Sequence, residues 1–117
     1  MNPAAQPFKV ETSASAAGAC VLKLSGPLTL QTLTNMQSAA QQEADKPLIL
    51  DLGGVAYMDS AGLGSVISVF TACQRTQRKF AITGLTERIQ KLFQLTRVNS
   101  ILPCHGTMAE AEASVAT

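Results

Sequence analysis

The first predicted structural unit is a pair of short strands within residues 8–24. In residues 8–12, Phe8, Val10 and Thr12 are separated by polar neighbours, and residues 20–24 form a second run of strand length. The small residues 13–18 between them supply a turn. Two short strands joined in this way predict an antiparallel pair at the edge of a sheet.

Three further segments have the composition of strands, at residues 48–50, 80–82 and 101–102. The run at 48–50 is continuously aliphatic, which is typical of a strand buried on both faces. After the last of these strands, His105 is expected to be a surface loop residue beside the half-buried Cys104.

Between the strands, side chains recur at the spacing of a helix. The four predicted stripes are Leu30, Leu33, Met36, Gln37 and Ala40; Leu63, Val66, Ile67, Phe70 and Cys73; Ile89, Leu92, Phe93 and Thr96; and Met108, Ala111 and Val115. Thr29 is a plausible N-cap of the first helix, which residues 45–47 end, and Thr86 opens the third. The cluster of Arg75, Arg78 and Lys79 is expected to be the solvated end of the second helix.

The resulting order of elements predicts an α/β fold. Helices that alternate with strands imply a mixed, mostly parallel sheet with right-handed crossovers, here of about five strands and about four helices. A chain of 117 residues has the length of one average domain. We therefore expect a single domain over residues 8–117, preceded by a loose leader at residues 1–7.

Composition restricts the classes of function. Nine Lys and Arg residues against eight Asp and Glu residues leave a net charge of +1, which lacks the basic surface of a nucleic-acid-binding protein. Charged residues make up 15% of the chain and hydrophobic residues 46%, which argues against disorder. Neither binding to nucleic acid nor, from the short apolar stretch at 61–73, insertion into a membrane is expected.

The three cysteines predict a reducing compartment. Cys20, Cys73 and Cys104 are odd in number and widely spaced, without a C-x-x-C pair, so a disulfide framework is a poor interpretation. No signal peptide is expected before the first predicted strand, because no basic residue precedes Lys9 and no apolar run follows Met1. The expected location is the cytoplasm.

The most informative residues are Asp59 and Ser60, which follow a buried strand and begin the strongest helix. Ligands and partners of such sheets meet the carboxyl ends of the strands. One interpretation is that Asp59 or Ser60 is an N-cap and nothing more. The other is that Ser60 is an exposed hydroxyl open to covalent modification, where a phosphate would lie over free N–H groups of the helix.

At these positions the sequence resembles the STAS domain family, in its anti-sigma factor antagonist form. The family has an aliphatic strand ending in Asp-Leu, a short hydrophobic step, and then aspartate, a phosphorylatable serine, a small residue and Gly-Leu-Gly. The matching residues are Leu48-Ile49-Leu50-Asp51-Leu52, then Tyr57-Met58-Asp59-Ser60-Ala61-Gly62-Leu63-Gly64, and a second block, Thr83-Gly84-Leu85-Thr86-Glu87-Arg88-Ile89 with Leu92-Phe93-Gln94-Leu95-Thr96. The resemblance covers roughly Val10 to Ala113.

The resemblance implies partner switching, a mechanism of bacterial transcription regulation. In the family, the unphosphorylated protein binds an anti-sigma factor that is also a serine kinase of the GHKL type. Phosphorylation at the position of Ser60 ends that interaction, and a PPM-type serine phosphatase restores it. The implied partner-binding residues are Asp59, Ser60, Ala61, Gly62, Leu63, Gly26, Thr29, Gly84 and Leu85.

The chain departs from the family pattern at two places. Many members have an acidic Gly-Glu-x-Asp turn where this chain has Gly26-Pro27-Leu28-Thr29, and many have a second hydroxyl where it has Ala61. The second departure leaves Ser60 as the single hydroxyl of the pair. The first favours a rival role, as a STAS subunit of a transport or lipid-trafficking complex that is not switched by phosphorylation.

Enzymatic and metal-binding interpretations have less support. Asp59, Ser60 and His105 could be assembled into a hydrolytic triad, but the Gly-x-Ser-x-Gly elbow is missing. Cys104-His105 has no second pair of ligands to complete a zinc site. The glycines of Gly62-Leu63-Gly64 are not part of a phosphate-binding loop, and they indicate close approach of the helix to the sheet or to a partner. We predict no enzyme activity, no metal and no cofactor.

Overall fold

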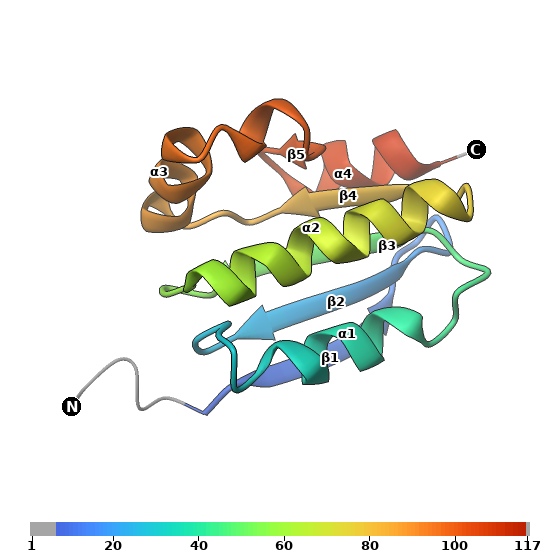
Figure 1. Ribbon diagram of the computed structural model, residues 1–117. Helices are drawn as coiled ribbons and strands as arrows, with labels where there is room; N and C mark the ends of the chain where they lie inside the picture. The colour runs from blue at the N-terminus through green and yellow to red at the C-terminus, as the bar shows by residue number, and fades with distance from the viewer. Residues whose placement is uncertain (1–6, 117) are drawn as a thin grey trace.

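The computed structural model describes residues 7–116, and it shows an α/β fold built on a five-stranded sheet. The strands follow one another in the order β1-β2-β3-β4-β5 (Figure 1). Their bounds are β1 Lys9–Ala14, β2 Cys20–Ser25, β3 Leu48–Gly54, β4 Phe80–Thr83 and β5 Cys104–His105. β1 is antiparallel to β2 and the other pairs are parallel, which confirms the predicted mixed, mostly parallel sheet.

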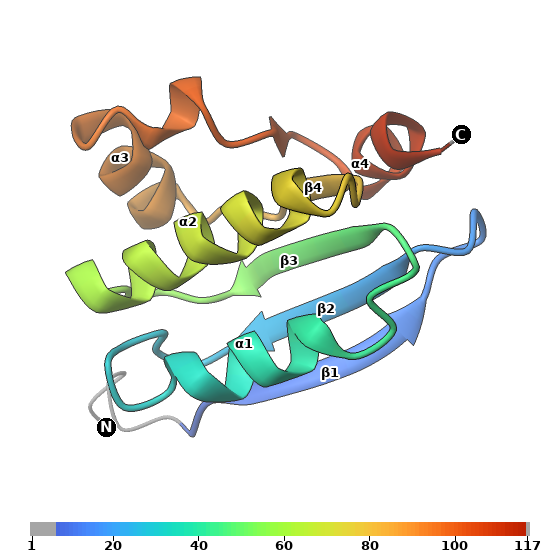
Figure 2. The same ribbon diagram turned by 45° about the vertical axis from the view of Figure 1, so that its right-hand side comes forward.

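Four α-helices cover the two faces of this sheet. Their bounds are α1 Leu33–Gln41, α2 Ser60–Arg75, α3 Glu87–Leu95 and α4 Met108–Val115. α1, α2 and α3 share a buried core with one face, where Leu22, Leu50 and Ile82 point. α4 lies on the opposite face, where Ala111 and Val115 pack on Ile49 (Figure 2). The helical stripes predicted for α2, α3 and α4 are therefore confirmed as core-facing, except at Thr96, which is exposed and is the C-cap of α3.

The predicted start of the first helix is wrong. α1 begins at Leu33, and its N-cap is Thr32. Thr29 lies in the turn before the helix, where its carbonyl accepts from the N–H groups of Thr32 and Leu33. Thr32 Oγ1 accepts from the N–H of Thr29 and donates to the carbonyl of Pro27. These bonds hold residues 27–32 as a loop, so Leu30 is not part of the buried stripe and is 66% exposed.

The last strand also differs from its prediction. Ile101 and Leu102 complete the turn after the short 3-10 helix η2, Val98–Ser100, because both their N–H groups donate to Val98. The N–H of Ile82 in β4 donates to the carbonyl of Pro103, so pairing starts there and β5 is Cys104–His105. These two residues are thus an edge strand where a surface loop was expected.

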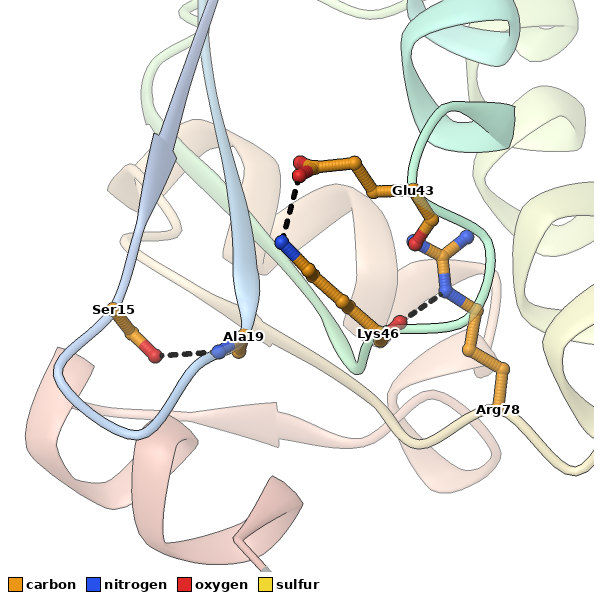
Figure 3. A network of polar contacts seen from close by, with 5 residues as sticks. All are labelled: Ser15, Ala19, Glu43, Lys46 and Arg78. Atoms are coloured by element: carbon orange, nitrogen blue, oxygen red, sulfur yellow. Dashed lines mark hydrogen bonds and ion pairs between the residues drawn. The ribbon is translucent and has the colours of Figure 1, made fainter.

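Arg78 is not the solvated helix end that its position suggested. α2 ends at Arg75, and the Arg78 side chain reaches back to the connection between α1 and β3. It donates to the carbonyl oxygens of Lys46 at 2.6 Å, Ala40 at 2.5 Å and Glu43 at 3.1 Å. Figure 3 shows Arg78 beside Lys46 and Glu43. A planar guanidinium can satisfy several acceptors at once, so Arg78 ties the end of α1 to the chain that follows α2.

The leader predicted at residues 1–7 lies outside the described residues except for Pro7, which is exposed. No helix in residues 7–116 is both long and apolar enough to cross a membrane.

Candidate functional site

Ser60 is the first residue of α2 and its side chain is exposed. Asp59 precedes it in extended conformation and is the N-cap, because its Oδ1 accepts from the N–H of Gly62 at 2.8 Å. The helix-capping interpretation therefore applies to Asp59, and the interpretation as an exposed, modifiable hydroxyl applies to Ser60. Asp59 caps the helix, and the Ser60 hydroxyl is left at the surface beside the positive end of the helix dipole.

The second oxygen of Asp59 connects the helix to a distant loop. Oδ2 accepts from the N–H of Leu30 at 3.2 Å, and the N–H of Asp59 donates to the carbonyl of Leu28 at 3.3 Å. Leu28 and Met58 form a parallel bridge just before α2. The loop after β2 and the segment after β3 are thereby joined next to Ser60.

Gly62 and Leu63 lie inside the protein. A Cβ built at Gly62 would be 2.1 Å from the carbonyl oxygen of Leu28, so only glycine permits this approach between α2 and the loop. Leu63 is 8% exposed and belongs to the core. Ala61 is half-buried, whereas Gly64 is exposed and has open space where a side chain would lie.

Gly26 and Thr29 border the site from the loop after β2. Gly26 is buried with φ of 84°, and a Cβ there would be 2.6 Å from the carbonyl oxygen of Pro7. Its N–H donates to the carbonyl of Gly54 at the end of β3. Gly26 therefore shapes the loop, while the half-buried Thr29 holds the turn that precedes α1.

Gly84 and Leu85 form the start of the β4–α3 connection. Gly84 has φ of 76°, and a Cβ there would meet Asp51 Oδ1 at 2.3 Å. Two residues on, Thr86 Oγ1 donates to the carbonyl of Val55 and accepts from the N–H of Ile89 as the N-cap of α3. The loop after β4 is therefore bonded to the segment after β3, at the edge where α2 begins (Figure 1).

Two exposed apolar residues at this edge were not predicted. Leu30 and Tyr57 are 66% and 45% exposed, and they lie in the two segments that Asp59 and Leu28 join. The sequence placed Leu30 on a helical stripe and gave Tyr57 no role. The hydrogen bonds that position these two segments, Leu30 to Asp59 and Leu28 to Tyr57, connect residues about thirty positions apart in the chain. The local hydrophobic pattern cannot predict contacts at that separation.

The enzymatic and metal-binding alternatives share His105, which lies on the edge strand β5. Its carbonyl accepts from Thr83 Oγ1 at 3.1 Å. In the described part of the chain, no group of three or more His, Cys, Asp or Glu residues could hold a metal ion. Cys20, Cys73 and Cys104 are free, and burial raises the pKa of all three thiols.

The fold and the site together define a class of α/β protein with an exposed serine at a capped helix start. The sequence model of the STAS domain matches residues 9–111, and the chain belongs to the STAS domain family.

Individual proteins similar to this chain include anti-sigma factor antagonists. A curated relative, the "Anti-sigma-B factor antagonist" of Staphylococcus aureus (strain NCTC 8325 / PS 47), is 26% identical over 84 residues, which are 69% of this chain and 78% of the relative. The crystal structure of an anti-sigma factor antagonist from Mycobacterium paratuberculosis has a TM-score of 0.81 at 20% identity, covering 93% of this chain and 94% of that one.

A second similar structure belongs to a different kind of protein. It is a sulfate transporter family protein from Wolinella succinogenes, with a TM-score of 0.72 at 13% identity over 86% of each chain. At these identities the two structural likenesses show the fold alone, so the function has to be argued from the site.

Proposed function

We propose that this protein is an anti-sigma factor antagonist that acts by partner switching. In its unphosphorylated form it binds an anti-sigma factor that is also a serine kinase of the GHKL type. Phosphorylation of Ser60 releases that partner, and a PPM-type serine phosphatase restores binding. The protein is then acted upon and supplies no catalysis of its own, and its proposed partners place it in the cytoplasm.

The observation that carries the proposal is the exposed Ser60 hydroxyl beside a carboxylate whose two oxygens are already occupied. Asp59 accepts from the N–H groups of Gly62 and Leu30, so it stays in place next to Ser60. A phosphate on Ser60 adds up to about two negative charges beside Asp59, and both would have to lose water in a close interface.

A small change in binding free energy is sufficient for a switch. A change of about 3 kcal/mol in binding free energy alters affinity by more than a hundredfold. The curated relatives named anti-sigma-B factor antagonist support the same role.

The test is incubation of the purified protein with its cognate kinase and ATP, followed by intact mass measurement. We expect one phosphate on the wild-type protein and none on Ser60→Ala. Ser68→Ala is the matched control, since Ser68 is an exposed serine on the same helix and should leave phosphorylation unchanged. No phosphate on the wild type, or equal incorporation by Ser60→Ala, would contradict the proposal.

A second candidate is a STAS subunit of a transport or lipid-trafficking complex that is not switched by phosphorylation. The loop Gly26-Pro27-Leu28-Thr29, which has no carboxylate, favours it. Pull-down of a permease component, with no kinase bound and no phosphate on Ser60, would decide for this role.

A further inference from the structure

β1, Lys9–Ala14, is an open edge of the sheet. It pairs with β2 on one side only, over six residues and without a shift of register (Figures 1 and 2). All of its residues are exposed except Val10, which is half-buried. Within residues 7–116, the backbone of this strand makes no hydrogen bond outside its pairing with β2. An edge of this length without a bulge is a template for a further strand.

The geometry of the β1–β2 pair restricts how a further strand can join. In an antiparallel pair, the N–H and C=O groups of successive residues point alternately toward the partner strand and away from it. Every second residue of β1 therefore directs these groups to the open edge. When two copies of β1 pair antiparallel about a twofold axis, residues that direct their groups outward must lie opposite each other. This condition is met only when the axis passes through a residue and not between two residues.

The charges of β1 select the residue on that axis. An axis at Lys9 or at Glu11 places two identical charges opposite each other, which is unfavourable. An axis at Val10 places Lys9 of each copy opposite Glu11 of the other, with valine opposite valine between them. An axis at Thr12 places Glu11 opposite Ser13 and so gives it no opposite charge. The axis at Val10 is therefore the favoured one, because it alone pairs both charges and a β-branched residue.

Lys9 and Glu11 are available for this contact. Their side chains are exposed and point to the face of the sheet opposite Val10, because side chains alternate along a strand. The salt bridge between Lys46 and Glu43 is the only one among residues 7–116, so neither Lys9 nor Glu11 is ion-paired within the described part of its own chain.

We infer that β1 is the surface by which two copies of this chain associate, through antiparallel pairing about a twofold axis at Val10. Main-chain hydrogen bonds hold the two strands together, and the pairs between Lys9 and Glu11 fix their register. The same surface is used by both copies, so the contact closes as a dimer and joins the two sheets into one. The inference is independent of the proposed function, because it uses neither Ser60 nor the partner proposed for it.

Sedimentation equilibrium of the purified chain over a dilution series tests the charge pairs. We expect the wild type to dimerise. Lys9→Glu and Glu11→Lys should each dimerise at least about tenfold more weakly, because the twofold axis repeats every altered pair. Lys91→Glu is the matched control, since it makes the same change of charge at an exposed position on α3 and should leave dimerisation unchanged. Circular dichroism should show the same fold for all.

The double variant Lys9→Glu/Glu11→Lys separates the contact between copies from effects within one chain. Glu11 lies opposite Lys23 of β2, so Glu11→Lys also creates a repulsion inside the chain. The double variant keeps that repulsion but restores opposite charges across the axis. We expect it to dimerise as the wild type does.

Introduced cysteines test the position of the axis. In Val10→Cys the two new thiols lie opposite each other at a Cα separation of about 4.5–5.5 Å, which a disulfide can bridge. Thr12→Cys is the matched control, because its thiol faces Phe8 of the other copy. Under the same mild oxidation we expect a covalent dimer for Val10→Cys and none for Thr12→Cys or the wild type. A wild type that is monomeric at every concentration, a dimer that both single charge reversals leave unchanged, or cross-linking of Thr12→Cys in place of Val10→Cys would each overturn the inference.

Discussion

The Asp59 carboxylate accepts a hydrogen bond from the backbone N–H of Leu30, 29 residues earlier in the chain, while its other oxygen caps α2. One side chain thus joins the loop after β2 to the start of the helix that carries Ser60. Because both oxygens accept from main-chain groups, this one carboxylate contacts both segments next to Ser60.

Replacing this carboxylate should loosen both elements. In Asp59→Asn, one oxygen remains to accept and the other bond is lost. We expect the free energy of unfolding to fall by about 1 kcal/mol, the usual net value of one hydrogen bond, because asparagine can still cap the helix. Amide hydrogen exchange at Leu30 should become faster. Asp45→Asn is the control, since Asp45 is exposed and its replacement should change neither quantity. Unchanged stability together with unchanged exchange at Leu30 would contradict the linking role of Asp59.

The two glycines of α2 should respond oppositely to alanine. At Gly62 a Cβ would be 2.1 Å from the carbonyl oxygen of Leu28, so Gly62→Ala must push the loop away. We expect a loss of about 2 kcal/mol or more in unfolding free energy, as for other overpacked sites. At Gly64 no atom would lie within 4 Å of the new methyl group. Gly64→Ala should therefore gain about 0.5–1 kcal/mol from helix propensity.

Urea denaturation of the two variants measures both changes. A destabilised Gly64→Ala would show that the helix needs glycine there for a reason within the chain. A neutral Gly62→Ala would show that the contact with Leu28 relaxes at no cost.

Arg78 should be more important for stability than its place beyond the helix suggests. Its guanidinium donates to three carbonyl groups. A lysine ammonium is a compact group without the planar fork of donors, so it cannot reach all three carbonyl oxygens. We expect Arg78→Lys to lower the free energy of unfolding by about 2 kcal/mol, from the lost bonds to a charged donor. Arg75→Lys is the control, because Arg75 is exposed at the end of α2. Equal midpoints for the two variants in thermal unfolding would refute this assignment.

Local patterns were sufficient for much of the fold. The order of the elements, the buried strand β3 and the stripes of α2, α3 and α4 follow from periodicity and capping residues, because those features act within a few residues of the chain. The same is true of the capped start of α2 at Asp59.

Contacts between distant residues account for what the sequence did not predict. Leu30 looked like part of a helical stripe, but the Thr29–Thr32 turn and the bond to Asp59 hold it in a loop. β5 has only two residues, and its position is set by pairing with β4 and not by its own composition. Arg78 bonds to residues more than thirty positions away. The exposed apolar pair beside Ser60 depends on such contacts, so it became visible only in the folded chain.

The thiol of Cys73 should make stability depend on pH in alkaline solution. Cys73 is 3% exposed, and desolvation by burial raises the pKa of its thiol, an effect that the nearby Arg78 partly offsets. A group whose pKa is raised in the folded state contributes stability below its ordinary pKa, here 9.0, and that contribution is lost as the pH rises through the folded value. The reason is that the thiol ionises at lower pH in the unfolded chain than in the folded one.

We expect the free energy of unfolding to fall more steeply from about pH 8 to about pH 10 in the wild type than in Cys73→Ala. Ser68→Ala, which removes a non-titrating side chain from the same helix, should keep the wild-type slope. An equal slope in Cys73→Ala would show that folding does not change the ionisation of this thiol.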